Sequence, residues 1–254
     1  MSREIWERVL EQTAPYVHTM QFYFQGEPLL HRDLPQMIAQ AHQKGLYTIV
    51  STNAQAMTQK LAEELIKAGL SRIIVSMDGL SQASYEAYRI GGDVARCKSA
   101  LRWLHEAKQQ WHARTCIELQ CLRLRTNEQE WHDLREQYKS LGADRLVFKT
   151  AQLSDYSEGH PLMPTDNRYS RYTQGADGHY HRKKLRRGCF RVWSGCVITT
   201  TGDVLPCCYD KAHEHAYGNI MTASLHDLFN NKKAVRFRKA ANQEQPTICH
   251  ECYK

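Results

Sequence analysis

Short apolar runs alternate with helical patterns over residues 1–150, and this alternation restricts the fold more than any other feature of the chain. Five runs have the composition of β-strands, at residues 20–24, 46–50, 72–77, 116–122 and 145–148. Strands separated by helices favour a parallel sheet of βαβ units, whose strands are covered on both faces. The sequence therefore predicts an α/β fold for this part of the chain.

Helical spacing between these runs defines the expected inner faces of the helices. The stripes are Ile5, Val9 and Leu10; Leu34, Met37, Ile38 and Ala41; Leu61, Leu65 and Ile66; and Val94, Cys97, Leu101 and Leu104. Gly69 is expected to end the third helix, and Asn127 to cap a further helix that carries Trp131 and Leu134. Because such a sheet normally opens with a strand, we expect a strand and its loop upstream of Met1.

Polar residues follow three of the expected strands where each strand ends. These segments are residues 25–27, 51–53 and 76–79, with the sequences QGE, STN and SMDG. Parallel α/β folds bind ligands at the carboxyl ends of their strands. Three polar ends at one edge therefore predict a ligand site there.

Cysteines concentrate at the other end of the chain, where six of the nine follow residue 188. Twelve residues separate Cys189 from Gly202, four separate Gly202 from Cys207, and Cys249 and Cys252 form a CxxC pair. The charged N-terminus has no signal-like core, and no apolar run has membrane-spanning length. We therefore expect a cytoplasmic protein with reduced thiols, and interpret the pattern as a metal site.

Zinc and iron–sulfur clusters are the groups that suit thiolate ligands. A hairpin of residues 192–200 and 204–208 is expected to bring Cys189 and Cys207 to the same end. Structural zinc prefers two CxxC turns, so the spacing here fits an iron–sulfur cluster better. Cys196 and Cys208 are surplus, and either is a substitute for an expected ligand.

The remaining segments complete the expected organisation. Ser224 is predicted to cap a helix running toward Ala240, and the unit of residues 189–254 has little core, so a metal would stabilise it. Residues 151–188 are polar and aperiodic, which predicts a linker or substrate loop.

The net charge is +7, and much of it comes from residues 181–187. We favour a solvated linker for this basic run over a contact with an acidic peptide or RNA. The remaining cysteines, Cys97, Cys116 and Cys121, are expected to be core thiols.

The cysteine-rich segment resembles the SPASM or twitch auxiliary-cluster domain of radical S-adenosylmethionine enzymes. The elements that carry the resemblance are CFRVW at 189–193, VI at 197–198, GDVLPCCYD at 202–210, GNI at 218–220 and the CxxC pair. The chain has two residues after the CxxC, so it is similar to the shorter version of the domain. The resemblance implies one auxiliary [4Fe-4S] cluster held by Cys189, Cys207, Cys249 and Cys252.

Residues 1–150 are similar to the family's partial (β/α)6 barrel, without its first strand. QGEPLL at 25–30 resembles the Gly-Gly-Glu-Pro motif that contacts the amino group of S-adenosylmethionine, and SMDG at 76–79 resembles the next signature. Arg89 matches an arginine that pairs with the methionyl carboxylate. The resemblance implies a cofactor site of Gly26, Glu27, Pro28, Asn53, Ser76, Asp78 and Arg89. Glu27 and Arg89 supply the charges that a zwitterion requires.

The family's CxxxCxxC motif, which holds the cluster that cleaves S-adenosylmethionine, is missing, because no cysteine precedes Cys97. We expect truncation, so that this chain alone forms no 5′-deoxyadenosyl radical; degeneration of the motif is the alternative. The full-length protein is expected to abstract hydrogen from a peptide or protein, with ferredoxin or flavodoxin as electron donor. Asp210 and Tyr209 are the candidates for acid–base catalysis.

Two other interpretations of the chain stay open. It could be a non-catalytic zinc- or cluster-binding module that contacts nucleic acid through the basic run. It could also be an inactive partner of an active homologue. The expected barrel and the retained Glu27 and Arg89 favour a small-molecule ligand, so we expect neither a membrane nor a nucleic acid as partner.

Overall fold

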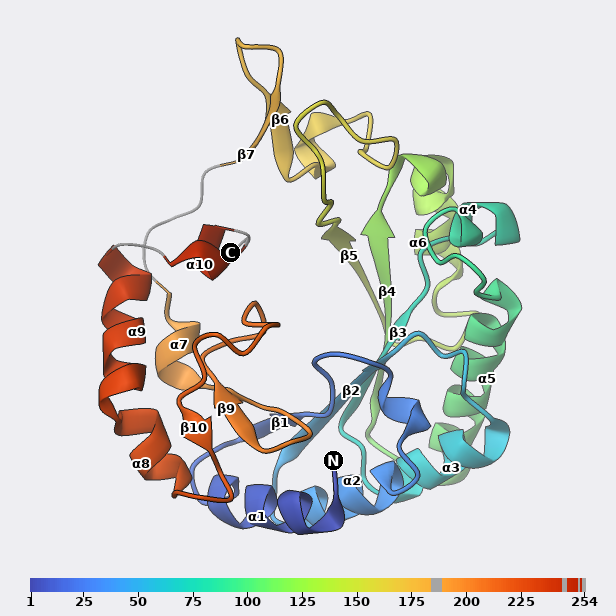
Figure 1. The fold of residues 1–254 in the computed structure, drawn as a ribbon. Helices are drawn as coiled ribbons and strands as arrows, with labels where there is room; N and C mark the ends of the chain where they lie inside the picture. Colours follow the sequence, from blue (N-terminus) through green and yellow to red (C-terminus); the bar gives the residue numbers. More distant parts are fainter. Residues whose placement is uncertain (184–188, 244–245, 251, 253–254) are drawn as a thin grey trace. The chain divides into compact units, whose positions relative to one another are not determined.

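A computed structural model describes residues 1–183, 189–243, 246–250 and 252 of the chain (Figure 1). The chain divides into two compact units. One comprises Thr19–Tyr23 and Glu27–Lys183, and the other comprises Met1–His18, Phe24–Gly26 and Lys184–Lys254. None of the described helices is long and apolar enough to cross a membrane.

A five-stranded parallel sheet forms the centre of the first unit, which confirms the predicted α/β fold. Its strands, β1 (Thr19–Gln21), β2 (Tyr47–Thr52), β3 (Arg72–Ser76), β4 (Cys116–Arg123) and β5 (Arg145–Thr150), are hydrogen-bonded in chain order. Because consecutive strands are neighbours and all run the same way, their carboxyl ends meet at one edge of the sheet.

Helices of the first unit pack against this sheet through the apolar stripes that the sequence indicates. They are α2 (Leu34–Gln43), α3 (Gln59–Lys67), α4 (Gln82–Glu86), α5 (Val94–Gln110) and α6 (Trp131–Gln137), and Figure 1 shows α2, α3 and α5 along the sheet. Ile38, Leu65 and Leu101 are fully buried in the shared core. Gly69 follows α3 with φ +80°, which confirms its predicted place at the end of that helix.

Asn127 does not cap α6, and that prediction is wrong. Residues 125–130 form a 3-10 helix, and α6 begins at Trp131. Asn127 lies inside the 3-10 turn, 1% exposed, where its Oδ1 accepts from the Leu124 amide at 3.1 Å. Its Oδ1 also accepts from Trp131 Nε1 at 2.7 Å, so this buried side chain joins the start of the 3-10 helix to α6 without capping α6.

Residues 150–183 are more ordered than their composition suggests. They contain a 3-10 turn at Asn167–Tyr169 and an antiparallel pair, β6 (Tyr172–Gln174) and β7 (Tyr180–Arg182). A small separate core forms around Leu124, Ala151, Leu153, Met163 and Tyr172. Tyr172 anchors it, because its hydroxyl bonds both the amide and the carbonyl of Leu153. Residues 184–187 of the basic run lie outside the described residues.

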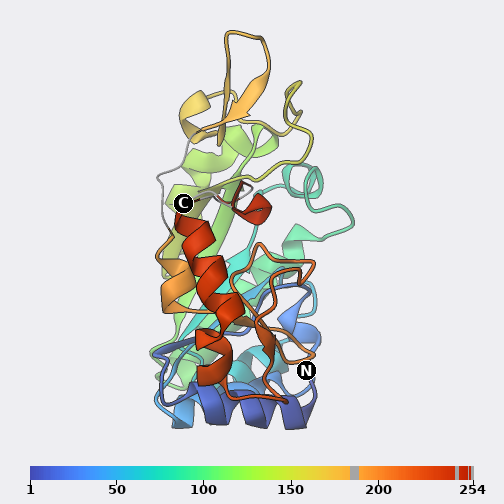
Figure 2. The ribbon, with the colours of Figure 1, turned by 60° about the vertical axis from the view of Figure 1, so that its left-hand side comes forward.

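The second unit contains a small antiparallel sheet and helices from both ends of the chain. The strands are β8 (Val197–Ile198), β9 (Asp203–Leu205) and β10 (Gly218–Asn219), in the order β10-β9-β8. The helices are α1 (Arg3–Thr13), α7 (Arg191–Ser194), α8 (Leu225–Asn230), α9 (Lys232–Gln243) and α10 (Thr247–His250). Gln12 joins the two ends, since its Oε1 accepts from the Leu225 amide at 2.6 Å. Figure 2 shows α9 beside α7.

Two details of this unit differ from the prediction. The expected strand at 192–200 begins as α7, whose Val192 is buried, and only residues 197–198 pair with β9. Ser224 is confirmed as the N-cap of α8, because its Oγ accepts from the Asp227 amide at 3.1 Å. The helix then breaks at Asn231, whose Oδ1 accepts from the Ala234 amide at 2.9 Å and so starts α9.

Candidate functional site

Glu27 lies at the carboxyl edge of the sheet and holds the first polar segment to the end of β2. Its Oε1 accepts from the Leu29 amide at 3.1 Å and the Thr52 hydroxyl at 2.6 Å, and its Oε2 accepts from the Asn53 amide at 2.9 Å. A carboxylate offers about four acceptor positions, so capacity remains on Oε2. Pro28 starts the 3-10 helix that Glu27 caps.

The next segment, after β2, adopts an unusual backbone. Ala54 has φ +62° and is fully buried, a conformation that is uncommon for a residue with a side chain and that concentrates at functional sites. Its neighbours hold it in place: Asn53 Oδ1 accepts from the Gln55 amide at 2.9 Å, and Thr52 Oγ1 accepts from the Ala54 amide at 2.9 Å. Gly26, in the segment before Glu27, has φ +83°.

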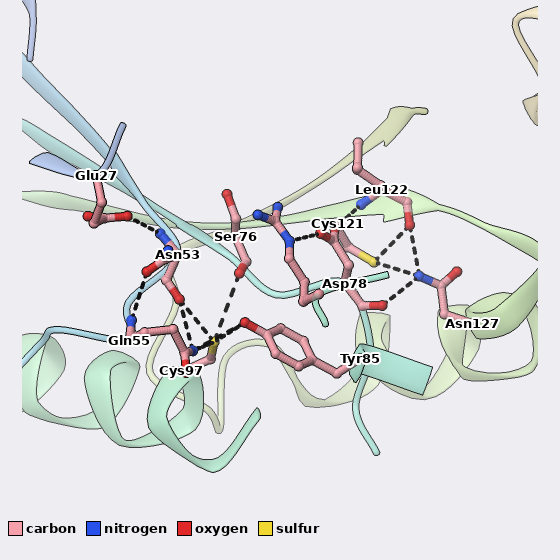
Figure 3. Close-up of polar contacts among 11 residues, drawn as sticks. Glu27, Asn53, Gln55, Ser76, Asp78, Tyr85, Cys97, Cys121, Leu122 and Asn127 are labelled. Atoms are coloured by element: carbon pink, nitrogen blue, oxygen red, sulfur yellow. Dashed lines mark hydrogen bonds and ion pairs between the residues drawn. The ribbon is translucent and has the colours of Figure 1, made fainter. Parts of the chain in front are cut away.

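A buried network around Cys97 joins the ends of β2 and β3 to α5 (Figure 3). The Cys97 thiol lies 3.5 Å from the carbonyl of Asn53, 3.4 Å from the Tyr85 hydroxyl and 3.9 Å from the carbonyl of Ser76. Burial raises the pKa of the Cys97 thiol and also that of the Tyr85 phenol. Both groups therefore stay protonated and hold the two strand ends together.

Asp78 and Arg89 form an ion pair after β3. Asp78 is fully buried, and its Oδ2 accepts from Arg89 Nε at 2.7 Å while its Oδ1 accepts from the Leu122 amide at 2.6 Å. Burial opposes the charge on Arg89, but Asp78 outweighs it and raises the pKa of the guanidinium. The Arg89 side chain keeps 29% of its surface exposed, and no described residue accepts from its two terminal nitrogens.

Asn127 and Glu130 support the segments that carry this pair, and neither was predicted as a site residue. Asn127 Nδ2 donates to the carbonyls of Asp78 at 2.9 Å and of Leu122 at 2.8 Å. Glu130 Oε2 accepts from the Leu80 amide at 2.6 Å and from the Ser84 hydroxyl of α4, also at 2.6 Å. Both residues lie about 50 positions beyond Asp78, so no local pattern could have indicated these contacts.

In the cysteine-rich unit, backbone hydrogen bonds place several of the expected ligands. The Cys189 amide donates to Asn242 Oδ1 at 2.9 Å, and the Cys252 amide donates to the carbonyl of Cys249 at 3.2 Å, which closes the CxxC turn. Burial raises the pKa of the Cys207 thiol. No three His, Cys, Asp or Glu side chains among the described residues converge as metal ligands.

The two surplus cysteines differ in their surroundings. Burial raises the pKa of Cys196 to about 11, whereas Cys208 is exposed. Asp210 is 1% exposed, and its carboxylate accepts from the amides of Glu214 at 2.9 Å and His215 at 3.0 Å. These contacts organise a loop, and the catalytic roles of Asp210 and of the half-buried Tyr209 stay predictions.

Glycines shape the hairpin between the expected ligands. Gly202 turns the chain with φ +90°, and a Cβ there would lie 2.9 Å from Asn219 Oδ1. Gly218 has φ +144°, and a Cβ would lie 2.6 Å from a Leu228 methyl. These two elements of the sequence pattern are therefore required by backbone conformation and by close packing.

Two family models match separate parts of the chain. Residues 2–118 match the radical SAM superfamily, and residues 189–253 match SPASM, an iron-sulfur cluster-binding domain. The two matches fall on the sheet that carries Glu27 and Arg89 and on the segment that carries Cys189 to Cys252.

Three curated enzymes are among the relatives of the chain. The chain is 29% identical over 110 residues to the Fe-coproporphyrin III synthase of Methanosarcina barkeri, covering 43% of this chain and 27% of that protein. It is 24% identical to the AdoMet-dependent heme synthase of Nitratidesulfovibrio vulgaris, covering 89% of this chain and 69% of the relative. It is 26% identical to the PqqA peptide cyclase of Rhizobium meliloti, covering 99% of this chain and 71% of that enzyme.

Solved structures show the same fold. The structure of anSMEcpe with AdoMet and a peptide has a TM-score of 0.63 and 18% identity, covering 99% of this chain and 80% of that one. SuiB of Streptococcus suis bound to S-adenosylmethionine has a TM-score of 0.71 and 16% identity, covering 98% and 64%. Together with the two family matches, the fold and the ordered motifs lead to one conclusion. Residues 2–118 belong to the radical SAM superfamily, and residues 189–253 form a SPASM iron–sulfur cluster-binding domain.

Proposed function

We propose that the carboxyl edge of the sheet binds S-adenosylmethionine, and that the whole protein is a radical SAM enzyme acting on a peptide or protein. The observation that carries the proposal is the Arg89 guanidinium, oriented by buried Asp78 through Nε while no described residue accepts from its terminal nitrogens. A guanidinium held in this way is prepared to receive a second carboxylate through parallel hydrogen bonds.

Glu27 complements Arg89 at the same edge. Three donors orient its carboxylate and leave one acceptor position for an ammonium group. The methionyl part of S-adenosylmethionine carries one ammonium and one carboxylate, so the two residues match its charges in sign. Gly26, Pro28, Asn53 and Ser76 complete the proposed site by shaping the backbone around it.

We further propose that Cys189, Cys207, Cys249 and Cys252 hold a [4Fe-4S] cluster, with Cys196 and Cys208 as substitutes. The donor set fits, because four soft thiols come from three segments of one unit. An additional fit comes from Arg238, a buried cation whose Nε and Nη1 find no acceptor in the described part of the chain and which an anionic group would compensate. When bound, such a cluster supplies single-electron transfer.

The substrate class is supported by relatives of this chain. Two PqqA peptide cyclases, of Rhizobium meliloti and Xanthomonas oryzae, align with 99% and 98% of the chain, and the heme synthase aligns with 89%. The anSMEcpe structure, with the same fold, contains a peptide. A ferredoxin or flavodoxin as electron donor and a cytoplasmic location remain predictions. The radical step requires the CxxxCxxC cluster, and no cysteine precedes Cys97 in these 254 residues, so this step is proposed for the whole protein.

Equilibrium dialysis with labelled S-adenosylmethionine tests the first part of the proposal. Glu27→Gln and Arg89→Met should each lower affinity about tenfold to a hundredfold, the value of one charge-assisted hydrogen bond. Glu106→Gln and Arg102→Met remove the same charges from an exposed pair on α5 and should leave affinity unchanged. Equal affinity in all four variants would exclude the proposed site.

Metal analysis tests the second part. The chain is reconstituted anaerobically with iron and sulfide, and iron, sulfide and zinc are counted. About four irons per chain, lost in Cys249→Ala and Cys252→Ala, are expected for the proposed cluster. About one zinc without labile sulfide would replace the cluster with a structural zinc site.

A further inference from the structure

A buried arginine in the cysteine-rich unit has two nitrogens for which the described residues offer no acceptor. Arg238 of α9 is 4% exposed, and its Nε and Nη1 are buried without a hydrogen-bond partner. Its guanidinium carbon lies 4.6 Å from the ring centroid of Phe229 and 5.1 Å from that of Trp193. Rings that flank the plane of a guanidinium hold it in place but offer nothing to the N–H groups at its edge.

Tyr217 adds a second uncompensated group. It is 2% exposed, and its hydroxyl is buried without a partner. Its backbone is fixed at both ends, since its amide donates to the Val204 carbonyl at 2.8 Å and its carbonyl accepts from Asn231 Nδ2 at 2.8 Å. Buried polar atoms are almost always satisfied, so three donors in one small unit that find no acceptor among the described residues indicate a missing acceptor.

Both residues belong to the region of the cysteines. Arg238 precedes Asn242 by four positions, which places the two side chains on one face of α9. Asn242 accepts from the Cys189 amide at 2.9 Å. Burial raises the pKa of the Tyr217 phenol; Arg238 opposes this shift, and Cys196 and Cys207 add to it. Tyr217 and Arg238 also share a neighbour, because the Phe229 ring centroid lies 6.4 Å from that of Tyr217 and 4.6 Å from the Arg238 guanidinium carbon.

We infer that Arg238 and Tyr217 face the proposed cluster, compensate its negative charge and hydrogen-bond its sulfurs, and so raise its reduction potential. A cluster with four thiolate ligands is anionic and becomes more negative when it gains an electron. A nearby buried cation stabilises the reduced form more than the oxidised form, and hydrogen bonds to sulfur act in the same direction. This inference rests on the proposed cluster. It gives Arg238 and Tyr217, which are not ligands, a role in setting the reduction potential.

Within the described residues, no protein group accepts a hydrogen bond from Nε or Nη1 of Arg238. The carboxylate of this unit that is most deeply buried, Asp210, already accepts two backbone amides. Burying an uncompensated guanidinium is costly, so packing between two rings alone would favour an apolar side chain at position 238. An anionic group bound beside the cysteines removes this cost.

The test is a redox titration of the reconstituted chain, followed by the electron paramagnetic resonance signal of the reduced cluster. Arg238→Met should lower the equilibrium constant for one-electron reduction about tenfold, equivalent to about 59 mV toward negative potential. Tyr217→Phe should shift the potential in the same direction by less. Arg238→Lys keeps the charge but loses the planar fork, and its potential should lie between those of the wild type and Arg238→Met.

Arg236→Met is the matched control, because it removes an exposed arginine from the same helix. Its potential should equal that of the wild type. If Arg238→Met and Tyr217→Phe also keep the wild-type potential, the inference is wrong while the cluster proposal stands. If the wild type binds no iron, the cluster proposal itself fails. Should Arg238→Met retain no cluster, the potentials of Arg238→Lys and Tyr217→Phe decide between tuning and simple packing.

Discussion

Asp78 accepts a hydrogen bond from Arg89 Nε at 2.7 Å, although Asp78 is completely buried and Arg89 is not. The same carboxylate accepts from the Leu122 amide. One buried charge thus fixes both Arg89, a residue of the proposed S-adenosylmethionine site, and the end of the neighbouring strand. Changes to it should affect stability and ligand affinity together.

Replacing Asp78 by asparagine tests this coupling. Asp78→Asn should lower the free energy of unfolding by about 2 kcal/mol, because a charged hydrogen bond is lost while shape is kept. It should also weaken S-adenosylmethionine binding, since Arg89 is no longer oriented. Urea unfolding and dialysis measure the two effects. Asp155→Asn, at an exposed position, is the control and should change neither.

Gly79 allows α4 to approach the end of β3. A Cβ there would lie 2.3 Å from Ser84 Oγ and 2.6 Å from the Tyr85 nitrogen. Gly79→Ala should therefore lower the free energy of unfolding by about 1–3 kcal/mol through overpacking. At Gly195 an added Cβ would meet nothing within 4 Å, so the same substitution there should be close to neutral. Equal effects in chemical unfolding would contradict the close approach.

Glu130 should make stability depend on pH. Burial opposes its charge, but hydrogen bonds from Ser84 and Leu80 outweigh burial and lower its pKa below the ordinary value of 4.5. A carboxyl whose pKa is lower in the folded state stabilises the fold fully above that ordinary value, and the contribution is lost as pH falls through the lowered pKa. Wild type should lose more stability than Glu130→Gln between about pH 6 and pH 3. Parallel curves from urea unfolding would refute this.

Asn231 serves two elements at once. Its Oδ1 caps α9 at the Ala234 amide and its Nδ2 donates to the Tyr217 carbonyl. Asn231→Ala should lower the free energy of unfolding by about 1–2 kcal/mol, because one N-cap and one buried hydrogen bond are lost. Asn230→Ala, which removes an exposed bond to the His226 carbonyl, should cost less. Thermal melts of the reconstituted variants compare the two.

Several elements followed directly from local chemistry. The parallel strands, the cap at Ser224 and the turn at Gly69 could be predicted because each depends on side-chain periodicity or on neighbours a few residues away. The break at Asn231 could not, since apolar spacing continues across it and the asparagine's partners include Tyr217, fourteen positions earlier.

The candidate sites divide in the same way. Glu27, Asp78 and Arg89 stand within short motifs and could be named from them. Asn127 could not, because its role consists of bonds to Asp78 and Leu122 that only the folded sheet brings near. Arg238 was hidden for another reason: an arginine on a basic helix is ordinarily solvated, and only its burial distinguishes it from Arg236.

The burial of Cys97 makes its thiol a probe of local opening in the sheet. Its thiol is bonded to the ends of β2 and β3, so a thiol reagent can reach it only when this part of the sheet opens. The rate at which Cys97 is labelled therefore reports how often the strand ends separate. If S-adenosylmethionine joins Glu27 to Arg89 as proposed, the labelling rate should fall in proportion to the fraction of chains that are occupied.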